Sequence, residues 1–469
     1  MIGLWAAIVP LAVYLSCPSM FWNFDGVACA AALELANPVY LFHAQHLLYG
    51  FFGLLFWKAL APLGVVKALP ALQIFCSVLT AISLGLLWRA LRDVTQDPWL
   101  AFLLSTAAGL GAAVWVWSVE AQVYPLGFLG LAGATALLLA PNAAPRMRAI
   151  GAWHALAILG HVVHVLWAIP ALYWIRKNRL PWKSYVATTV GLVVLAYAEV
   201  WYCVLRRHHG QGAWLSYWLK GSLGLTADRS IAWHWPGWSG PWQWLQATPG
   251  QWWGTFWPYG GVSVPTAIHL LSVASQLALA GLLILALRRW RTQPLVGFAL
   301  LWIGVYALFF CTWEPRMLCY RMTDAIPYSL LLAVGAQALP ARAARYALAG
   351  FWLVSLGIVN FWTRAWPMHD VARNRLYQQT VLLAKVTPER SIYLTEGGLP
   401  WIYMLYFTGR SAWNVQAMSL ANFDASWSQL HPRPALYAMS NLLRDPQAAA
   451  WLMRHHMHLL PDLPWLEVS

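Results

Sequence analysis

The sequence predicts a polytopic all-α membrane domain followed by a small α/β domain. Hydrophobic residues make up 60% of the 469 residues and charged residues only 10%, whereas an ordinary soluble domain is about one-quarter charged. The lysines and arginines occur in short clusters between long apolar runs, as topology signals do in membrane proteins. We therefore ascribe the net charge of +14 to orientation in the bilayer and expect no nucleic-acid partner.

Nine apolar runs match a bilayer-spanning helix, which needs about 20 mostly apolar residues. They are residues 2–17, 69–88, 98–116, 123–140, 184–205, 265–287, 294–312, 323–339 and 345–363. The first run has no basic segment before it and no small-residue cleavage site, so we predict a retained helix and not a removed signal peptide. These runs belong to an expected membrane domain of residues 1–366.

A further apolar run, residues 150–175, is long for a single crossing and carries His161 and His164 at its middle. Basic residues flank it at both ends. Two half-length helices that meet at the far face of the bilayer would place both basic ends on the same side. We therefore predict a half-length helical hairpin, which raises the number of crossings to about 11.

The positive-inside rule gives the expected orientation. With this number of crossings, every basic cluster falls on the cytoplasmic side, together with the N-terminus. The clusters are Arg89/Arg92, Arg146/Arg148, Arg176 to Lys183, Arg288/Arg289/Arg291 and Arg342/Arg345. The extracytoplasmic side then receives loops 18–68 and 206–264, segment 314–324 and residues 367–469. The last of these alternate between strand-like and helix-like segments, which indicates the small α/β domain.

One predicted loop is rich in tryptophan, whereas the cysteines follow no recognisable pattern. Loop 206–264 holds ten tryptophans, which suit either an interfacial aromatic belt or stacking platforms for sugars; both interpretations stay open. The six cysteines show no CxxC pair and no histidine at zinc-like spacing. Neither a disulfide framework nor a structural metal is therefore expected.

Four short motifs carry polar side chains on the predicted extracytoplasmic side. They are Asp25, with Asn37–Tyr40, His43 and His46 after it; Ser118–Tyr124, which includes Glu120 and Tyr124; Leu159–His164, which includes His161 and His164; and Glu314–Arg316, followed by Arg321 and Pro327. In this order they resemble the motifs of the GT-C integral membrane glycosyltransferases, nearest to the branch related to protein O-mannosyltransferases. The resemblance spans most of the chain.

The resemblance implies an inverting transfer of a sugar from a polyprenyl-phosphate carrier to a hydroxyl acceptor. Asp25 is then the expected base that takes the proton of the hydroxyl. Arg316, and after it Arg321, are expected to stabilise the lipid phosphate that leaves. The other substrate-binding candidates are Glu120, Tyr124, His43, His46, His161 and His164. Glu120 would orient Asp25 or bind sugar hydroxyls, and the His161/His164 pair would bind phosphate or sugar.

Each candidate also has an ordinary structural explanation. Asp25 would serve equally as a helix cap, and Arg316 and Arg321 as interfacial anchors that snorkel. His161 and His164 would be packing residues. Glu120 is harder to explain in this way, because a carboxylate inside the bilayer is costly.

The sequence departs from the resembling family in the first loop, where many relatives carry two neighbouring acids. Here the next acid after Asp25 is Glu34, nine residues further on. A single carboxylate is a poor site for Mg²⁺ or Mn²⁺ without substrate phosphate. No cofactor is therefore firmly implied, and a divalent cation is not expected.

Two other functions remain as alternatives. A polymerase or ligase of lipid-linked glycans would use the same motifs, whereas a lipid or glycan transporter would need ionisable residues near the bilayer midplane and often has internal repeats. The expected partners are the lipid-linked donor, a hydroxyl acceptor and the bilayer. The lack of an Asn-x-Ser/Thr sequon favours a bacterial inner membrane.

Overall fold

The computed structural model describes residues 1–35, 41–209, 237–257, 263–415 and 434–438, together with residues 427, 442, 450, 458 and 459. The predicted motif Asn37–Tyr40 and the first four tryptophans of loop 206–264 lie outside the described residues. The chain forms two units, each described by itself below. The first comprises residues 1–19 and 32–369, and the second comprises residues 20–31 and 370–469.

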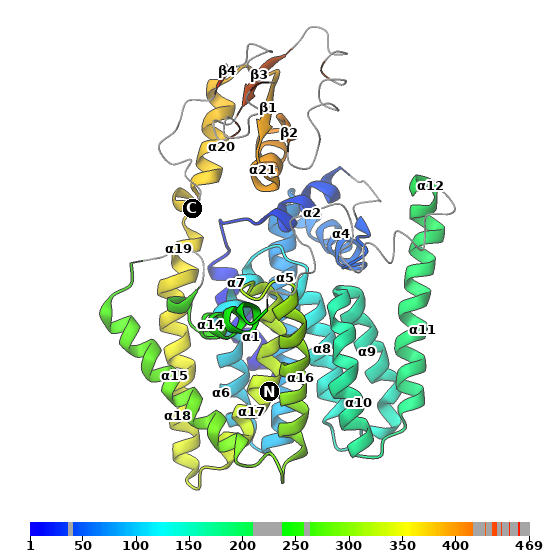
Figure 1. The fold of residues 1–469 in the computed structure, drawn as a ribbon, viewed down its shortest axis with the longest axis vertical. Coiled ribbons are helices and arrows are strands. Elements are labelled where there is room, and N and C mark those ends of the chain that lie inside the picture. Colours follow the sequence, from blue (N-terminus) through cyan, green and yellow to red (C-terminus); the bar gives the residue numbers. More distant parts are fainter. Residues whose placement is uncertain are drawn as a thin grey trace. The chain divides into compact units, whose positions relative to one another are not determined.

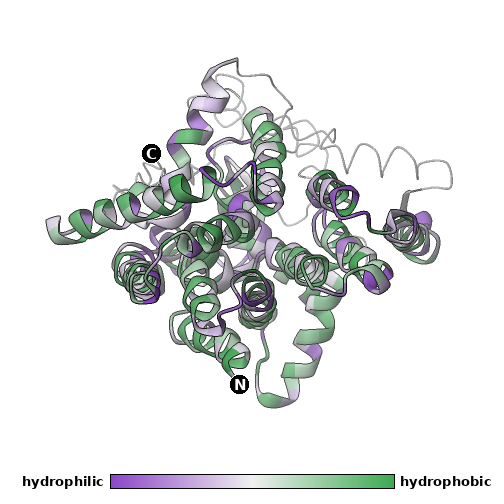
Figure 2. Ribbon diagram, turned by 90° about the horizontal axis from the view of Figure 1, so that it is seen from below, coloured by the Kyte–Doolittle hydropathy of each residue, from purple (hydrophilic) through white to green (hydrophobic). Residues whose placement is uncertain are grey.

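The first unit is a helical bundle (Figure 1). Its longer helices are α1 (Ile2–Ser16), α4 (Tyr49–Leu60), α5 (Ala68–Thr95), α6 (Pro98–Gly109), α7 (Ala112–Val119), α8 (Tyr124–Leu138), α9 (Met147–Gly160), α10 (Ala168–Lys177), α11 (Trp182–Val200), α14 (Ser239–Trp252), α15 (Thr266–Leu287), α16 (Pro294–Thr312), α17 (Ala325–Gln337) and α18 (Arg342–Asn360). Seen nearly end-on, these helices are mainly hydrophobic (Figure 2). An apolar, mainly helical chain of this kind is an integral membrane protein.

Among the described residues, five helices are long and apolar enough to cross a membrane, and α6 with α7 would make a sixth. The five are Ala68–Thr95, Trp182–Leu205, Thr266–Leu287, Pro294–Thr312 and Arg342–His369. Shorter apolar helices such as α1 and α8 coincide with other predicted spans. The count of about 11 crossings stays a prediction.

The predicted helix 98–116 is wrong in one respect, because the chain bends by 65° between α6 and α7. The bend leaves helix carbonyls without their usual partners, which is tolerated at membrane depth only when other groups bind them. The Tyr14 hydroxyl donates to the Gly109 carbonyl (2.7 Å), and the Asn360 side-chain amide donates to the Leu110 carbonyl (2.6 Å). Both partners come from distant helices.

The predicted interruption of run 150–175 is confirmed. Helix α9 ends at Gly160, the 3₁₀ helix η3 (Val162–Trp167) follows, and α10 begins at Ala168. His161 is the residue between α9 and η3, with an extended backbone. Glycines let α8 pack closely on α9, because a Cβ on Gly130 would lie 2.4 Å from the Ala157 nitrogen. Small residues at such crossings are typical of membrane helices.

The second unit contains the predicted C-terminal α/β fold. Its sheet is parallel with strand order β2-β1-β3-β4. The elements are α20 (Arg375–Val386), β1 (Ser391–Thr395), α21 (Gly398–Thr408), β2 (Ser411–Asn414), β3 (Ala435–Ala438) and β4 (His458–Leu459). Gly397 adopts a φ of 86° ahead of α21, a left-handed conformation that glycine permits. Residues 20–31 also belong to this unit and open α2 (Phe24–Glu34).

Candidate active site

Asp25 lies in the first turn of α2, and its side chain is exposed. The helix begins at Phe24, so the capping position belongs to Asn23. The Asn23 side-chain oxygen accepts a hydrogen bond from the Gly26 amide (3.0 Å), as an N-cap residue does. Asp25 is therefore not the cap of this helix, and its carboxylate stands at the positive end of the helix dipole.

The C-terminal helices hold the segment that leads to Asp25. Asn374, at the start of α20, donates to the Met20 carbonyl (2.7 Å). Tyr403 of α21 donates to the Trp22 carbonyl (2.5 Å). The Trp22 ring packs on Phe407, with ring centroids 4.8 Å apart. The sequence did not predict that the C-terminal domain positions the candidate base, because these contacts join residues about 350 to 380 positions apart.

Four predicted substrate-binding residues form a cluster of rings in the first unit. The His43 and His46 rings stack with centroids 4.2 Å apart, and His46 lies 6.5 Å from His161. The Tyr124 ring stacks on His161 at 5.5 Å. The backbone fixes this arrangement, since the Gln45 carbonyl accepts from the Val162 amide (2.8 Å). Three separate motifs therefore meet at the start of η3.

Protonation of this cluster is disfavoured. Burial lowers the pKa of His46, and the neighbouring His43 and His161 imidazoles lower that pKa further. A neutral imidazole has one donor nitrogen and one acceptor nitrogen. Such a side chain suits hydrogen bonds with sugar hydroxyls better than ion pairing with a phosphate.

His164 faces a different environment from His161. Its Nδ1 lies 3.0 Å from the Tyr306 hydroxyl, and its carbonyl lies 2.9 Å from the His154 Nε2 atom. A Cβ on Gly127 would come within 2.3 Å of its Nε2 atom, so this nitrogen points at the α8 backbone. These contacts favour a packing role for His164. Its ring also meets the His161 ring edge-on, with centroids 6.0 Å apart, so His164 adjoins the cluster and its predicted substrate contact stays a prediction.

Tyr320 completes the cluster and was not among the predicted site residues. Its ring lies 5.4 Å from Tyr124 and 6.1 Å from His161, and it stacks on Phe310 at 5.1 Å. Tyr320 stands between Arg316 and Arg321 in the sequence, so its position in the arginine motif could have marked it as a candidate site residue. An aromatic ring beside two histidines offers a flat face for a sugar.

Glu120 is buried, with 4% of its surface exposed, at the end of α7. The turn around it is tied to α5, because Gln73 donates to the Val119 carbonyl (3.0 Å) and the Cys76 thiol donates to the Gln122 carbonyl (3.1 Å). Tyr124 begins α8 only four residues later. The same rigid turn therefore carries both Glu120 and one ring of the cluster.

The two candidate arginines differ in their partners. Arg321 is 1% exposed, pairs with Asp324 at 3.2 Å and lies over the Trp244 ring at 4.3 Å. Burial raises the pKa of Asp324 to about 6, although the Arg321 guanidinium acts in the opposite direction. Arg316 is exposed, and no ion pair of the described residues includes it. Asp324 therefore neutralises the charge of Arg321 within the protein, whereas the charge of Arg316 is available to bind a ligand.

Among the described residues, no group of three or more His, Cys, Asp or Glu side chains could hold a metal ion. Glu34, the next acid after Asp25, accepts from the Ala68 amide (2.9 Å) and pairs with Lys67 (3.2 Å). Nine residues along one helix correspond to a rise of about 13 Å. Asp25 and Glu34 are thus too far apart to bind one cation together.

The bundle, the broken helices and the small C-terminal sheet together define the class of the fold, which is structurally similar to the GT-C membrane glycosyltransferases. ArnT from Cupriavidus metallidurans in the apo state aligns with a TM-score of 0.60 and 14% identity, over 94% of this chain and 93% of that chain. The same protein bound to undecaprenyl phosphate aligns with a TM-score of 0.58 and 12% identity, over 95% and 88%.

The apo oligosaccharyltransferase from Archaeoglobus fulgidus is also similar, with a TM-score of 0.53 and 9% identity, over 88% of this chain and 64% of that chain. No protein-family model and no curated protein matches the sequence. At these identities the comparisons establish the fold alone.

Proposed function

We propose that this protein transfers a sugar, with inversion, from a polyprenyl-phosphate carrier to a hydroxyl acceptor on the extracytoplasmic face. The observation that carries the proposal is a GT-C fold over nearly the whole chain, with an acid at the first turn of α2 that is not needed as the helix cap. One of the similar structures is ArnT bound to undecaprenyl phosphate. A lipid-phosphate donor therefore fits this fold.

In the proposed reaction, the acceptor oxygen attacks the anomeric carbon of the sugar. Asp25 takes the proton of the hydroxyl as the new carbon–oxygen bond forms, which contributes about 10²- to 10⁴-fold to the rate. The bond between the anomeric carbon and the phosphate oxygen breaks at the same time. The carrier leaves as polyprenyl phosphate, and Arg316 stabilises the charge that develops on it through paired N–H donors.

The ring cluster would bind the sugar. Stacked aromatic faces and neutral imidazoles offer flat surfaces and single hydrogen bonds to hydroxyl groups. His46, His161, Tyr124 and Tyr320 are the residues that the structure brings together for this purpose. Glu120, on the turn that carries Tyr124, would accept hydrogen bonds from sugar hydroxyls.

The narrower assignments are also proposals. Mannose is the first sugar to test, because the motifs resemble those of the branch related to protein O-mannosyltransferases. A bacterial inner membrane, with the N-terminus in the cytoplasm, agrees with the basic clusters. A polymerase or ligase of lipid-linked glycans remains the second candidate, since it would use the same base and the same cation.

Purified protein should be incubated with a panel of polyprenyl-phosphate monosaccharides and polyprenyl-linked glycans, and loss of sugar from the lipid followed by mass spectrometry. We expect turnover of one monosaccharide donor by the wild type. The matched control is Glu389→Gln, an exposed acid in the second unit, which should leave turnover unchanged. Turnover of glycan chains only would favour the polymerase or ligase, and no turnover of any donor would contradict the proposal.

A further inference from the structure

Arg316 stands on a short loop whose two ends are bonded to each other. We call residues 313–320 the arginine loop; it follows α16 and runs into the 3₁₀ helix η6 (Cys319–Asp324). The Trp313 indole N–H donates to the Tyr320 hydroxyl (3.3 Å), so the first residue of the loop is bonded to the last. Trp313 is buried, with 8% of its surface exposed, whereas Arg316 is exposed. The bond therefore closes the loop at its buried base.

Stacked rings fix both ends of the arginine loop on α16. The Trp313 ring stacks on Phe309, with centroids 6.2 Å apart, and the Tyr320 ring stacks on Phe310 at 5.1 Å. Phe309 and Phe310 are neighbours near the end of α16, and consecutive side chains of a helix point about 100° apart. The indole–hydroxyl bond thus joins two rings that pack on different sides of the same helix.

The backbone that carries Arg316 is also ordered from within the loop. The Met317 amide donates to the Glu314 carbonyl (3.1 Å), which makes a turn with Pro315 and Arg316 at its centre. Proline favours the first central position of such a turn, because its φ is fixed. Leu318 then enters the bundle, with 1% of its surface exposed. The Arg316 side chain therefore extends into solvent from a backbone with little freedom.

Tyr320 has a contact on each side of the candidate site. Its hydroxyl accepts the bond that closes the arginine loop, and its ring lies beside Tyr124 and His161 in the ring cluster. A displacement of Tyr320 would therefore move both the end of the arginine loop and one face of the cluster. The proposed phosphate cation and the proposed sugar site are connected through this single residue.

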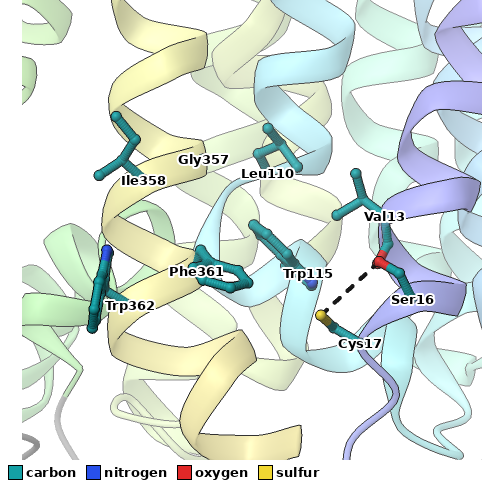
Figure 3. Close-up of a pocket in the computed structure, with 9 residues that line it drawn as sticks. All are labelled: Val13, Ser16, Cys17, Leu110, Trp115, Gly357, Ile358, Phe361 and Trp362. Carbon is teal, nitrogen blue, oxygen red and sulfur yellow. Dashed lines mark hydrogen bonds between the residues drawn. The ribbon is translucent and has the colours of Figure 1, made fainter.

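Another buried tryptophan of the first unit provides a comparison for Trp313. Trp115 lines an apolar groove between the end of α1, the bend that joins α6 to α7, and the end of α18 (Figure 3). No charged side chain is among the described residues that line this groove. Trp115 is 4% exposed, and its indole N–H has no hydrogen-bond partner in the described part of the chain. Replacing Trp115 with phenylalanine would remove the same atoms as at Trp313 without breaking a hydrogen bond.

We propose that Trp313 is a positioning residue for Arg316 and that it acts through Tyr320. The Trp313 indole closes the arginine loop and thereby holds the guanidinium at a fixed place relative to the ring cluster. A cation stabilises a developing charge best when it is already in position, because no reorganisation is then needed during the reaction. The inference rests on the proposed function, in which Arg316 stabilises the leaving phosphate. It adds a residue that lies outside the predicted motifs.

The first test compares Trp313→Phe with the matched variant Trp115→Phe. Phenylalanine keeps a ring that can stack on Phe309 and removes the N–H that closes the loop. We expect the kcat of Trp313→Phe to fall about tenfold while the KM for the donor changes less than about twofold, because the cation acts mainly in the transition state. Trp115→Phe should keep the wild-type kcat. Equal kcat values for the two folded variants would overturn the proposal.

The second test combines Trp313→Phe with Arg316→Lys. If Trp313 acts by placing the guanidinium, the loss of its N–H should matter little once the guanidinium is gone. We therefore expect Trp313→Phe to lower kcat by less than about twofold in the Arg316→Lys background, against about tenfold in the wild type. A residue that merely stabilises the fold would cost the same factor in both backgrounds, and that result would overturn the proposal.

The third test needs no donor. Hydrogen exchange of the full-length protein, followed by mass spectrometry, reports local opening of the backbone. The peptide that covers residues 313–320 should exchange faster in Trp313→Phe than in the wild type and should be unchanged in Trp115→Phe. Unchanged exchange in Trp313→Phe would overturn the proposal, even if the protein turns a donor over. Faster exchange would support closure of the loop by Trp313, even if no donor is turned over and the proposed function fails alone.

Discussion

Two helix breaks interrupt the apolar bundle, and they are built in opposite ways. At the bend between α6 and α7, side chains from other helices bind both free carbonyls, at 2.7 and 2.6 Å, and the break lies beside an apolar groove. At the break between α9 and η3, the chain supplies its own polar residue, His161, and several rings gather around it. We call the first break closed, because side chains of distant helices bind its carbonyls. We call the second break open, because it presents polar side chains, although its Val162 and Val163 amides donate to the Gln45 carbonyl and to the His161 Nδ1 atom.

This difference indicates that the break between α6 and α7 mainly stabilises the fold, and that the break between α9 and η3 mainly binds and converts substrate. Broken backbone in a membrane protein is tolerated where it is satisfied by protein or lines a cavity. Substitutions at the closed break should therefore lower stability, and substitutions at the open break should lower activity. The predictions below test that contrast, from the largest expected effect to the smallest.

Asn360→Leu should give the largest loss of stability. Asn360 is fully buried and joins three groups, the Leu110 carbonyl, the Trp252 carbonyl and the Gly254 amide, at 2.6 to 2.8 Å. Leucine keeps the size and leaves all three groups unpaired, so the free energy of unfolding should fall by about 2–4 kcal/mol. Thermal unfolding in mild detergent measures this, with exposed Asn178→Leu as the control. Equal Tm values for Asn360→Leu and the wild type would show that the bend does not depend on the Asn360 amide.

Arg316→Lys should lower turnover strongly, by about tenfold to a hundredfold, because lysine keeps the charge but loses the paired donors of the guanidinium. This residue lies in the connection whose Tyr320 packs on His161. Arg321→Lys should have a smaller effect on turnover and should mainly lower Tm, since Arg321 forms a buried ion pair. Initial rates of both variants, measured at saturating and at low donor concentration, test this expectation. Wild-type rates for Arg316→Lys would leave an anchoring role for Arg316.

His161→Phe should reduce turnover by about tenfold with only a modest fall in Tm. Phenylalanine retains the stacking face towards Tyr124 and removes the Nε2 atom that would bind a sugar hydroxyl, together with the Nδ1 atom that accepts from the Val163 amide (3.3 Å). His164→Phe is the matched variant, because it removes the contact with Tyr306 and should lower Tm more than turnover. A reversed result, with His161→Phe unstable and His164→Phe inactive, would exchange the roles assigned to the two histidines.

Tyr14→Phe should have the smallest effect. It removes the buried hydrogen bond to the Gly109 carbonyl and the one with the Ser118 side chain and keeps the ring, so the free energy of unfolding should fall by about 1–2 kcal/mol. Turnover should match that of the wild type. A loss of turnover without a loss of Tm would mean that the closed break also takes part in the reaction.

The two breaks also show what sequence reasoning can and cannot reach. The break at His161 was predictable because its cause, polar residues within a long apolar run, lies in the run itself. The bend after Gly109 was missed, because its partners Tyr14 and Asn360 lie 95 and 250 positions away. An apolar run of suitable length carries no trace of distant hydrogen bonds, so residues 98–116 resembled one ordinary span.

The same limit applies to the candidate site. The motifs with Glu120, Tyr124 and His161 were predicted by residue, and three of the motifs do meet in space. Tyr320 was missed because a tyrosine carries no charge that would mark it, although it stands between two arginines. The anchoring of the Asp25 segment by Asn374 and Tyr403 was missed because it requires the fold of the second unit.

Turnover of the donor by Asp25→Asn tests the central claim most directly. The amide keeps the shape of the side chain, and Asn23 still caps the helix, so folding and donor binding should stay near those of the wild type. Without the base, kcat should fall by about a hundredfold or more. Retention of more than about a tenth of the wild-type kcat, with Glu389→Gln measured alongside, would contradict the assignment of Asp25 as the catalytic base.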